Sequence, residues 1–312
     1  MARPRCLGTW SLARSTMAPP RRRGAFATVC ANWGAEVKRI YTMGGSPAER
    51  HLTVADVIAA KGQRTLVQAT ASSVEEARAA AAAGIDMLSV SAGEELRIVR
   101  AAAPHLFLNT ALPMTQFACA EELLRGAYGA MEDGADAVYF CGPVSWIEYL
   151  SKAAIPVMGH AGLVPRKSLW LGGLRAFGKT PDEARQLWRD IRNLENAGAY
   201  AVEIEVVPTA LTAEITRASS LVVSSIGAGA EADIIFQFTE DTLGLDPTPP
   251  RHVRRYDDFH ARLLALQEAR VAALGQFARD ARSGSYPGED HIVATPPAAL
   301  DALREAIERD KA

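Results

Sequence analysis

The chain has 312 residues, of which 48% are hydrophobic and 22% are charged, enough to bury the core of one barrel-sized domain. Its net charge of −2 at pH 7 gives no electrostatic reason to expect a nucleic acid or an anionic membrane as a partner. No apolar run approaches the ~18–20 residues that span a bilayer. The four scattered cysteines lack metal-ligand spacing and a disulfide framework, which favours a reducing, cytoplasmic location.

Residues 1–35 form a basic leader with several arginines and no acid before Glu36. Such a leader can be an organellar transit peptide, a disordered tail, or sequence upstream of a later start at Met17 or Met43. Pro19 and Pro20, next to a run of three arginines, interrupt the amphipathic helix that import requires. We therefore predict a disordered leader.

Beyond the leader, short apolar runs alternate with amphipathic helical segments, the pattern of parallel strands joined by helices. We predict strands near residues 65–69, 87–91, 106–109, 137–140, 156–159, 201–205, 221–226 and 233–236. Predicted helices cover residues 73–83, 94–102, 118–132, 144–152, 181–197 and 209–218. Eight such units predict a single-domain α/β fold, a TIM (β/α)8 barrel, over residues 36–291. A doubly wound sheet is the alternative, but no G-x-G-x-x-G motif follows the first strand.

The C-terminal stretch, residues 292–312, is predicted to be a helical extension. Leu300, Leu303 and Ile307 recur at helical spacing between residues 298 and 310. We expect this helix to pack on the barrel or on a neighbouring subunit.

Two segments in the middle of the chain carry the strongest motif. Residues 156–165 read PVMGHAGLVP, a buried strand that ends in His160 and opens into a glycine-rich loop, and residues 171–180 read LGGLRAFGKT. Further matches are EVVP at 205–208, IGAG at 226–229, and Pro250, Val253, Arg255 and Tyr256. Together these segments resemble the ketopantoate hydroxymethyltransferase family, whose fold is a barrel like that of phosphoenolpyruvate mutase and isocitrate lyase.

The resemblance implies a transferase of pantothenate biosynthesis that moves a hydroxymethyl group from 5,10-methylenetetrahydrofolate to 3-methyl-2-oxobutanoate with the help of Mg²⁺. It also implies a homo-oligomer. In the family, acids close the second, third and fourth strands and organise the magnesium ion, with a lysine also on the fourth. Aligned here are Ser91, Ala111 and Cys141 in place of the acids, and Tyr139 in place of the lysine. We therefore expect no metal ligands at the standard site.

The resemblance assigns catalysis to Glu205, as the base that removes a proton next to a keto group, and to His160, near the keto oxygen. Glu205 could instead form a salt bridge with Lys179, Arg166 or Arg175. His160 could be a satisfied hydrogen-bonding group, or it could donate to an oxyanion.

The ends of the barrel strands also supply substrate-binding candidates: Ser91, Tyr139, Cys141 and Gly227. Each has a simpler reading. Cys141 can be a small polar filler, because a thiol needs a nearby base or cation to become a nucleophile. Tyr139 can cap its strand with aromatic bulk, and Gly227 can allow close packing beneath the mouth.

Three functions remain open from the sequence. The favoured one is a divergent, hydroxymethyltransferase-like enzyme that acts on a small 2-oxo or β-dicarbonyl acid by proton abstraction and C–C bond chemistry, without the usual magnesium. The alternatives are the genuine hydroxymethyltransferase, using Mg²⁺ and 5,10-methylenetetrahydrofolate, and a non-catalytic scaffold paralogue. No cofactor is certain.

Overall fold

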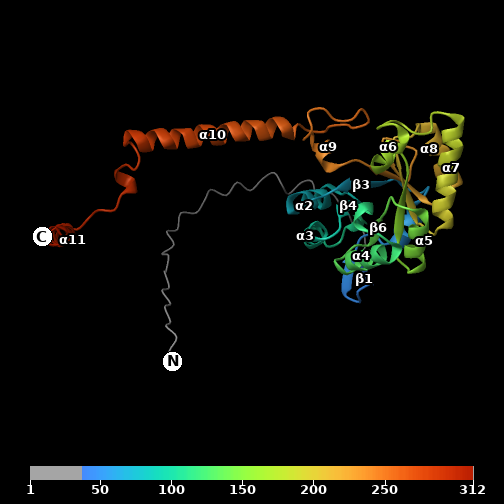
Figure 1. The fold of residues 1–312 in the computed structure, drawn as a ribbon, viewed down its shortest axis with the longest axis horizontal. Coiled ribbons are helices and arrows are strands. Elements are labelled where there is room, and N and C mark those ends of the chain that lie inside the picture. Colours follow the sequence, from blue (N-terminus) through green and yellow to red (C-terminus); the bar gives the residue numbers. More distant parts are fainter. Residues whose placement is uncertain (1–36, 312) are drawn as a thin grey trace, which may run out of the picture.

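A computed structural model describes residues 37–311, so the predicted leader lies outside the described residues. Eight parallel strands close into a barrel in the order β10-β3-β4-β5-β6-β7-β8-β9, which confirms the predicted single-domain TIM barrel (Figure 1). The strands are β3 (Leu66–Thr70), β4 (Met87–Ser91), β5 (Phe107–Ala111), β6 (Ala137–Tyr139), β7 (Val157–Gly162), β8 (Ala201–Glu205), β9 (Val222–Ile226) and β10 (Ile234–Phe236).

The outer helices follow the strands at the predicted places. They are α2 (Val74–Ala83), α3 (Glu94–Ala102), α4 (Ala120–Glu132), α5 (Val144–Lys152), α7 (Pro181–Asn196) and α8 (Thr209–Ala218), with the short α6 (Ser168–Leu171) before α7. Local signals set their ends. The Thr180 side chain accepts a hydrogen bond from the backbone N–H of Glu183, and Pro181 occupies the first turn of α7. Gly84 ends α2 with φ of 80°, a conformation that glycine adopts without a steric penalty.

The barrel interior is apolar at the amino ends of the strands and polar above. One inward side chain from each strand builds the lower core: Leu66, Met87, Phe107, Ala137, Met158, Ala201, Val222 and Ile234. Because side chains alternate along a strand, the inward position two residues later comes next. Those positions hold Gln68, Ser89, Asn109, Tyr139, His160, Glu203, Ser224 and Phe236. We call the seven polar members of this set the polar ring.

The sequence did not lead us to expect the segment that precedes the barrel. An antiparallel hairpin of β1 (Lys38–Tyr41) and β2 (Pro47–Arg50) is followed by α1 (Val54–Ala60). Arg50 at the end of the hairpin is 3% exposed and donates through Nε to Asp136 Oδ1 at 2.7 Å. Asp136 also accepts from Arg100 Nη2 at 2.6 Å and from the backbone N–H of Leu108 at 2.9 Å. This charge cluster ties the hairpin to the amino ends of β5 and β6.

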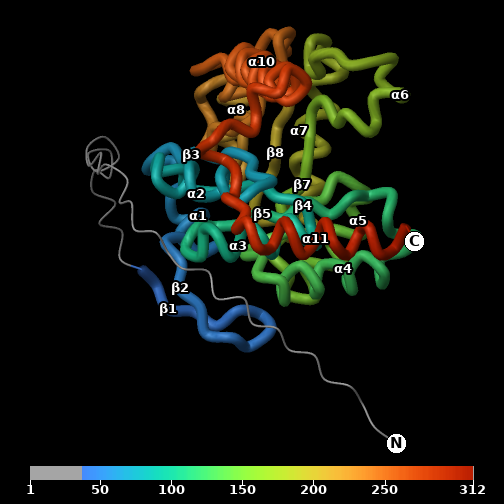
Figure 2. The backbone as a smooth tube through the Cα atoms, turned by 90° about the vertical axis from the view of Figure 1, so that its left-hand side faces the viewer, coloured from blue at the N-terminus to red at the C-terminus, as the bar shows by residue number. Residues whose placement is uncertain are grey.

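The C-terminal part leaves the barrel after α9 (Thr239–Leu243). Helix α10 (Phe259–Ser283) extends away from it, and α11 (Pro297–Arg309) lies beyond (Figure 1), whereas Figure 2 looks nearly along the axis of α10. The predicted terminal helix is therefore present, but neither α10 nor α11 has a buried residue. Of the two expected packing sites for the terminal helix, its own barrel is not used, and a neighbouring subunit stays a prediction. Of the helices in residues 37–311, none is long and apolar enough to cross a membrane.

Candidate active site

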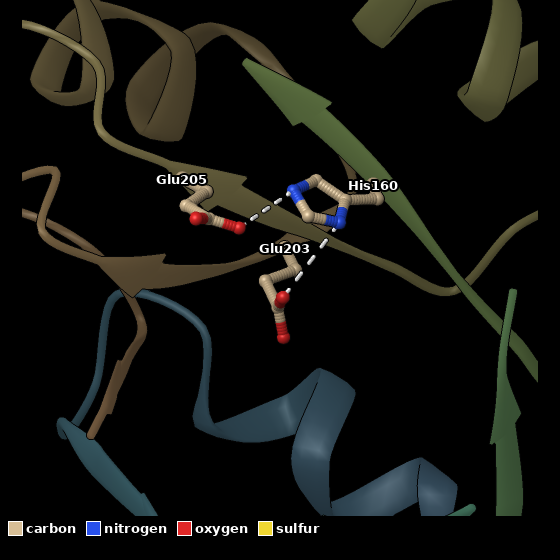
Figure 3. Close-up of side chains that lie close together, drawn as sticks. All are labelled: His160, Glu203 and Glu205. Carbon is tan, nitrogen blue, oxygen red and sulfur yellow. Dashed lines mark ion pairs between the residues drawn. The ribbon is translucent and has the colours of Figure 1, made fainter. Parts of the chain in front are cut away.

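The carboxyl ends of β7 and β8 bring the two predicted catalytic residues together. In the parallel register His160 is opposite Glu203, and Gly162 is opposite Glu205. His160 Nε2 is 3.4 Å from Glu205 Oε2, and His160 Nδ1 is 3.8 Å from Glu203 Oε1 (Figure 3). The histidine thus lies between two carboxyl groups that project from one strand.

Hydrogen bonds define the state of His160. Its Nε2 is 3.0 Å from the carbonyl oxygen of Leu163, which can only accept, so Nε2 carries the proton. Its Nδ1 then accepts from the hydroxyl group of Tyr139. Burial lowers the pKa of His160 to about 4, so the imidazole is neutral at pH 7. Both ring nitrogens have partners within the protein.

Glu205 has the properties of a base poised near neutral pH. Its side chain keeps 15% of its exposure, and burial raises its pKa to about 7. The cationic partners that the sequence allowed are not used in the structure. Arg175 pairs with Glu183 at 2.7 Å, and within residues 37–311 Glu205 lies against the neutral His160 and forms no salt bridge with a lysine or arginine.

Glu203 is a site residue that the sequence reasoning missed. It is 7% exposed, and burial followed by repulsion from Glu205 raises its pKa to about 8. A usable signal was present, because in the strand AVEIE the two glutamates are two residues apart and must share one face. Reading that alternation would have placed Glu203 one step below Glu205 inside the barrel.

The backbone around Glu205 is constrained on both sides. Val206 has φ of 48°, which is rare for a β-branched residue and is held by a bond from its N–H to the Ile226 carbonyl at 2.9 Å. On the facing strand, Gly162 has φ of 87°, and a Cβ atom there would come within 2.5 Å of the Glu205 carbonyl oxygen. Only glycine fits this approach, which sets the position of Glu205 against β7.

The remaining predicted site residues lie at the same end of the barrel with different surroundings. Tyr139 is half-buried and contacts His160. Cys141 is buried, and burial raises the pKa of its thiol, so thiolate formation is disfavoured. Ser91 ends β4 in an exposed position, and Gly227 (φ of 62°) follows β9 close to the ring of His252. The structure therefore joins Tyr139 to the His160–Glu203–Glu205 cluster and places Cys141 beside Tyr139, while Ser91 and Gly227 lie at the ends of other strands.

Comparison with known proteins agrees with this architecture. The sequence pattern of ketopantoate hydroxymethyltransferase matches residues 91–289, which is more than half of the chain. A 3-methyl-2-oxobutanoate hydroxymethyltransferase of Thermus thermophilus is 36% identical over 268 residues, covering 77% of this chain and 98% of the relative. The enzyme of the same name from Pyrobaculum islandicum is 32% identical over 266 residues, covering 78% and 98%. The chain belongs to the ketopantoate hydroxymethyltransferase family.

Solved structures with a similar fold are distant in sequence. Phosphonopyruvate hydrolase in complex with oxalate and Mg²⁺ has a TM-score of 0.46 and 14% identity, over 83% of this chain and 98% of that one. A 2,3-dimethylmalate lyase has a TM-score of 0.48 and 13% identity, over 83% and 94%.

The three positions aligned from the sequence with the family's metal-binding acids hold Ser91, Ala111 and Cys141. Ser91 and Ala111 end β4 and β5, and Cys141 follows β6. They offer a hydroxyl, a methyl and a thiol, whereas Mg²⁺ prefers carboxylate and other hard oxygen ligands. These residues do not fit the ion.

His160, Glu203 and Glu205 form the one group among residues 37–311 that is close enough to be considered for a metal. A ring nitrogen and one oxygen of each carboxyl group lie within 4.8 Å of one another. Yet the Nε2 proton bonds to Leu163, and the Nδ1 lone pair accepts from Tyr139. A metal would have to break one of these bonds, so we interpret the cluster as a proton-transfer site.

Proposed function

We propose that this family member removes a proton next to the keto group of a 2-oxo or β-dicarbonyl acid and then forms or breaks a C–C bond, without the usual magnesium. The observation that carries the proposal is the Glu205 carboxyl group, partly accessible at the end of β8 with a pKa of about 7. Membership of a family whose relatives are named for acting on 3-methyl-2-oxobutanoate supports the substrate class.

The chemistry follows from the protonation states. Ionised Glu205 takes the proton from carbon, the C–H electron pair becomes a C=C bond, and the keto oxygen becomes an enolate. The enolate carbon then attacks an electrophilic carbon, and the keto group re-forms. His160, held by Leu163 and Tyr139, orients Glu205 through its Nε2 side. Ser91, Tyr139, Cys141 and Gly227 remain our candidates for contacting the substrate around this point.

The second candidate function is the parent hydroxymethyl transfer from 5,10-methylenetetrahydrofolate with Mg²⁺. Identity of 36% to a named hydroxymethyltransferase favours it. The side chains of Ser91, Ala111 and Cys141 count against it, because a metal Lewis acid contributes several kcal/mol at a developing enolate. The scaffold alternative is disfavoured by the clustered acids and histidine, which a non-catalytic protein does not need.

We expect the chain to fail to complement a pantothenate auxotroph that lacks its own hydroxymethyltransferase, even with magnesium added to the medium. The reason is the missing carboxylate ligands for Mg²⁺ at Ser91, Ala111 and Cys141. The measurement is growth without pantothenate, with a Thermus thermophilus relative as the positive control. Full rescue that disappears in Glu205→Gln would establish the parent activity instead.

We also propose a cytoplasmic homo-oligomer in which α10 of one subunit packs on a second copy. Leu263, Leu266, Leu274 and Phe277 of α10 are 46–68% exposed, and Trp170 in the short helix α6 is 92% exposed. A helix that exposes several large apolar side chains is a candidate association site. Most helical stability in proteins comes from tertiary packing, and α10 has no buried residue in its own subunit.

The test is the mass of the full chain by light scattering. We expect a dimer or a larger even-numbered assembly, and we expect Leu266→Asp with Leu274→Asp to lower the mass. Glu268→Gln, on the same helix, is the control. A wild-type protein that is monomeric at micromolar concentration would refute the association.

A further inference from the structure

The polar ring contains hydrogen-bonding groups that the protein itself leaves without partners. Gln68 is 1% exposed, and neither Nε2 nor Oε1 of its amide has a partner. Ser224 Oγ and Asn109 Oδ1 are likewise buried and unpartnered. Buried polar groups in proteins nearly always bond to protein, water or a ligand. The ring is therefore arranged to meet something that enters the barrel.

The ring can be approached from the mouth. The next inward positions above it include Ser91, Ala111 and Gly162, whose side chains are small or absent. Ser89 and Tyr139 in the ring are themselves half-buried, not fully enclosed. A small molecule at the mouth can thus extend one polar atom down to the level of Glu203.

Glu203 is the acidic residue of this ring, and its carboxyl group has no counter-ion among residues 37–311. Its Oε1 is 3.8 Å from Nδ1 of the neutral His160, which is beyond hydrogen-bond distance. Within residues 37–311 no lysine or arginine pairs with it, and Ser224 is its neighbour on β9. A carboxylate in this position would be an unpaired buried charge beside a second carboxylate, which is costly, whereas a neutral acid is not.

We propose that Glu203 is a catalytic residue that acts as a neutral carboxylic acid and donates a hydrogen bond to the enolate oxygen formed when Glu205 takes the proton. This inference rests on the proposed proton abstraction. The Glu203 and Glu205 oxygens lie within 4.8 Å of each other, so adjacent atoms of one small molecule can contact both. The donor stabilises the charge that the family's magnesium would otherwise neutralise.

The protonation states support these two roles, Glu205 as the base and Glu203 as the hydrogen-bond donor. Burial raises the pKa of both acids, to about 7 for Glu205 and to about 8 for the more deeply buried Glu203, which Glu205 also repels, so Glu203 is the member of the pair that holds its proton more strongly. The groups that face Glu203 are His160 on β7, Tyr139 at the end of β6, Cys141 just after β6, and Glu205 on β8. His160 is neutral, burial raises the pKa values of Tyr139 and Cys141, and the β9 and β10 neighbours, Ser224 and Phe236, do not titrate.

The test follows exchange of the proton next to the keto group by NMR in deuterated water. The probes are 3-methyl-2-oxobutanoate, 2-oxobutanoate and pyruvate, from about pH 6 to about pH 9. Glu203→Gln keeps a neutral donor of the same shape, so we expect a loss of only about tenfold at pH 7. Glu203→Leu removes the donor, and we expect a loss of ~10²–10³-fold. Glu214→Gln on the exposed outer face of α8 is the control and should match the wild type.

The pH dependence of exchange separates a catalytic role of Glu203 from a structural one, because loss of a structural group would leave the shape of the pH profile unchanged. In the wild type, exchange should fall above about pH 8, as Glu203 loses its proton, and Glu203→Gln should abolish that fall. If Glu203→Gln is as inactive as Glu203→Leu, the ionised form is required, as a metal ligand or base, and the proposal is overturned. Unchanged exchange in Glu203→Leu overturns it too.

If none of the probes exchanges its proton, that result counts against the proposed function. Infrared spectroscopy then still tests whether Glu203 is neutral. In Glu205→Gln, which removes the neighbouring acid with a pKa near 7, a protonated carboxyl band should be present at pH 7, and it should disappear in the double variant Glu203→Gln/Glu205→Gln. A Glu205→Gln spectrum without that band refutes a neutral Glu203.

Discussion

Glu205→Gln should reduce substrate-dependent proton exchange by ~10²–10⁴-fold, the loss typical of removing a general base. The amide has nearly the same shape as the carboxyl group but cannot take a proton. In the wild type the rate should rise with pH through about 7, because the base works in its ionised form and burial places its pKa there. In Glu205→Gln this rise should be absent.

The measurement is again NMR in deuterated water with a 2-oxo acid that the wild type exchanges. Circular dichroism should show an unchanged fold, because Glu205 is partly accessible and its neighbour His160 is neutral at pH 7. Glu214→Gln, at an exposed position of α8, should exchange like the wild type. Exchange that persists in Glu205→Gln at the wild-type rate would show that Glu205 is a structural group.

Asp136→Ala should lower the free energy of unfolding by ~3–5 kcal/mol, the cost of breaking a buried ion pair by removing one partner. The carboxylate of Asp136 is 8% exposed and bridges Arg50 and Arg100, whose side chains are 4% and 13% exposed. Without it, two guanidinium groups remain buried without a counter-ion. Burial already lowers the pKa of Arg100 to about 10 with Asp136 in place.

The matched control is Asp133→Ala. Asp133 pairs with Arg97 at 2.8 Å, but the Arg97 side chain is 57% exposed, so we expect a cost of only ~0–1 kcal/mol. Urea unfolding followed by circular dichroism compares the two variants. Equal midpoints for Asp136→Ala and Asp133→Ala would mean that the buried cluster contributes no more than a surface pair.

The local part of this structure could be predicted from the sequence. Alternation of apolar runs and amphipathic segments located the eight barrel strands and the outer helices to within a few residues, because these signals depend on neighbours in the chain. Thr180 and Pro181, next to each other at the start of the predicted helix 181–197, are such local signals, and Thr180 caps α7. Helix α10 and the hairpin of β1 and β2 were not predicted. Helix α10 has apolar residues with no stripe that a barrel-facing helix would show, and the hairpin strands are short and mostly exposed.

The candidate site could likewise be predicted only in part from the sequence. The motifs placed Glu205 and His160 at strand ends. The sequence by itself therefore determined the family, the barrel fold and the position of these two residues in it. Only the closed barrel decided that Glu203 joins them, that Tyr139 occupies one nitrogen of His160, and that Gln68 and Ser224 are buried without partners. The physical reason is that burial and the resulting protonation states depend on side chains from strands far apart in the chain, which meet only when the barrel closes.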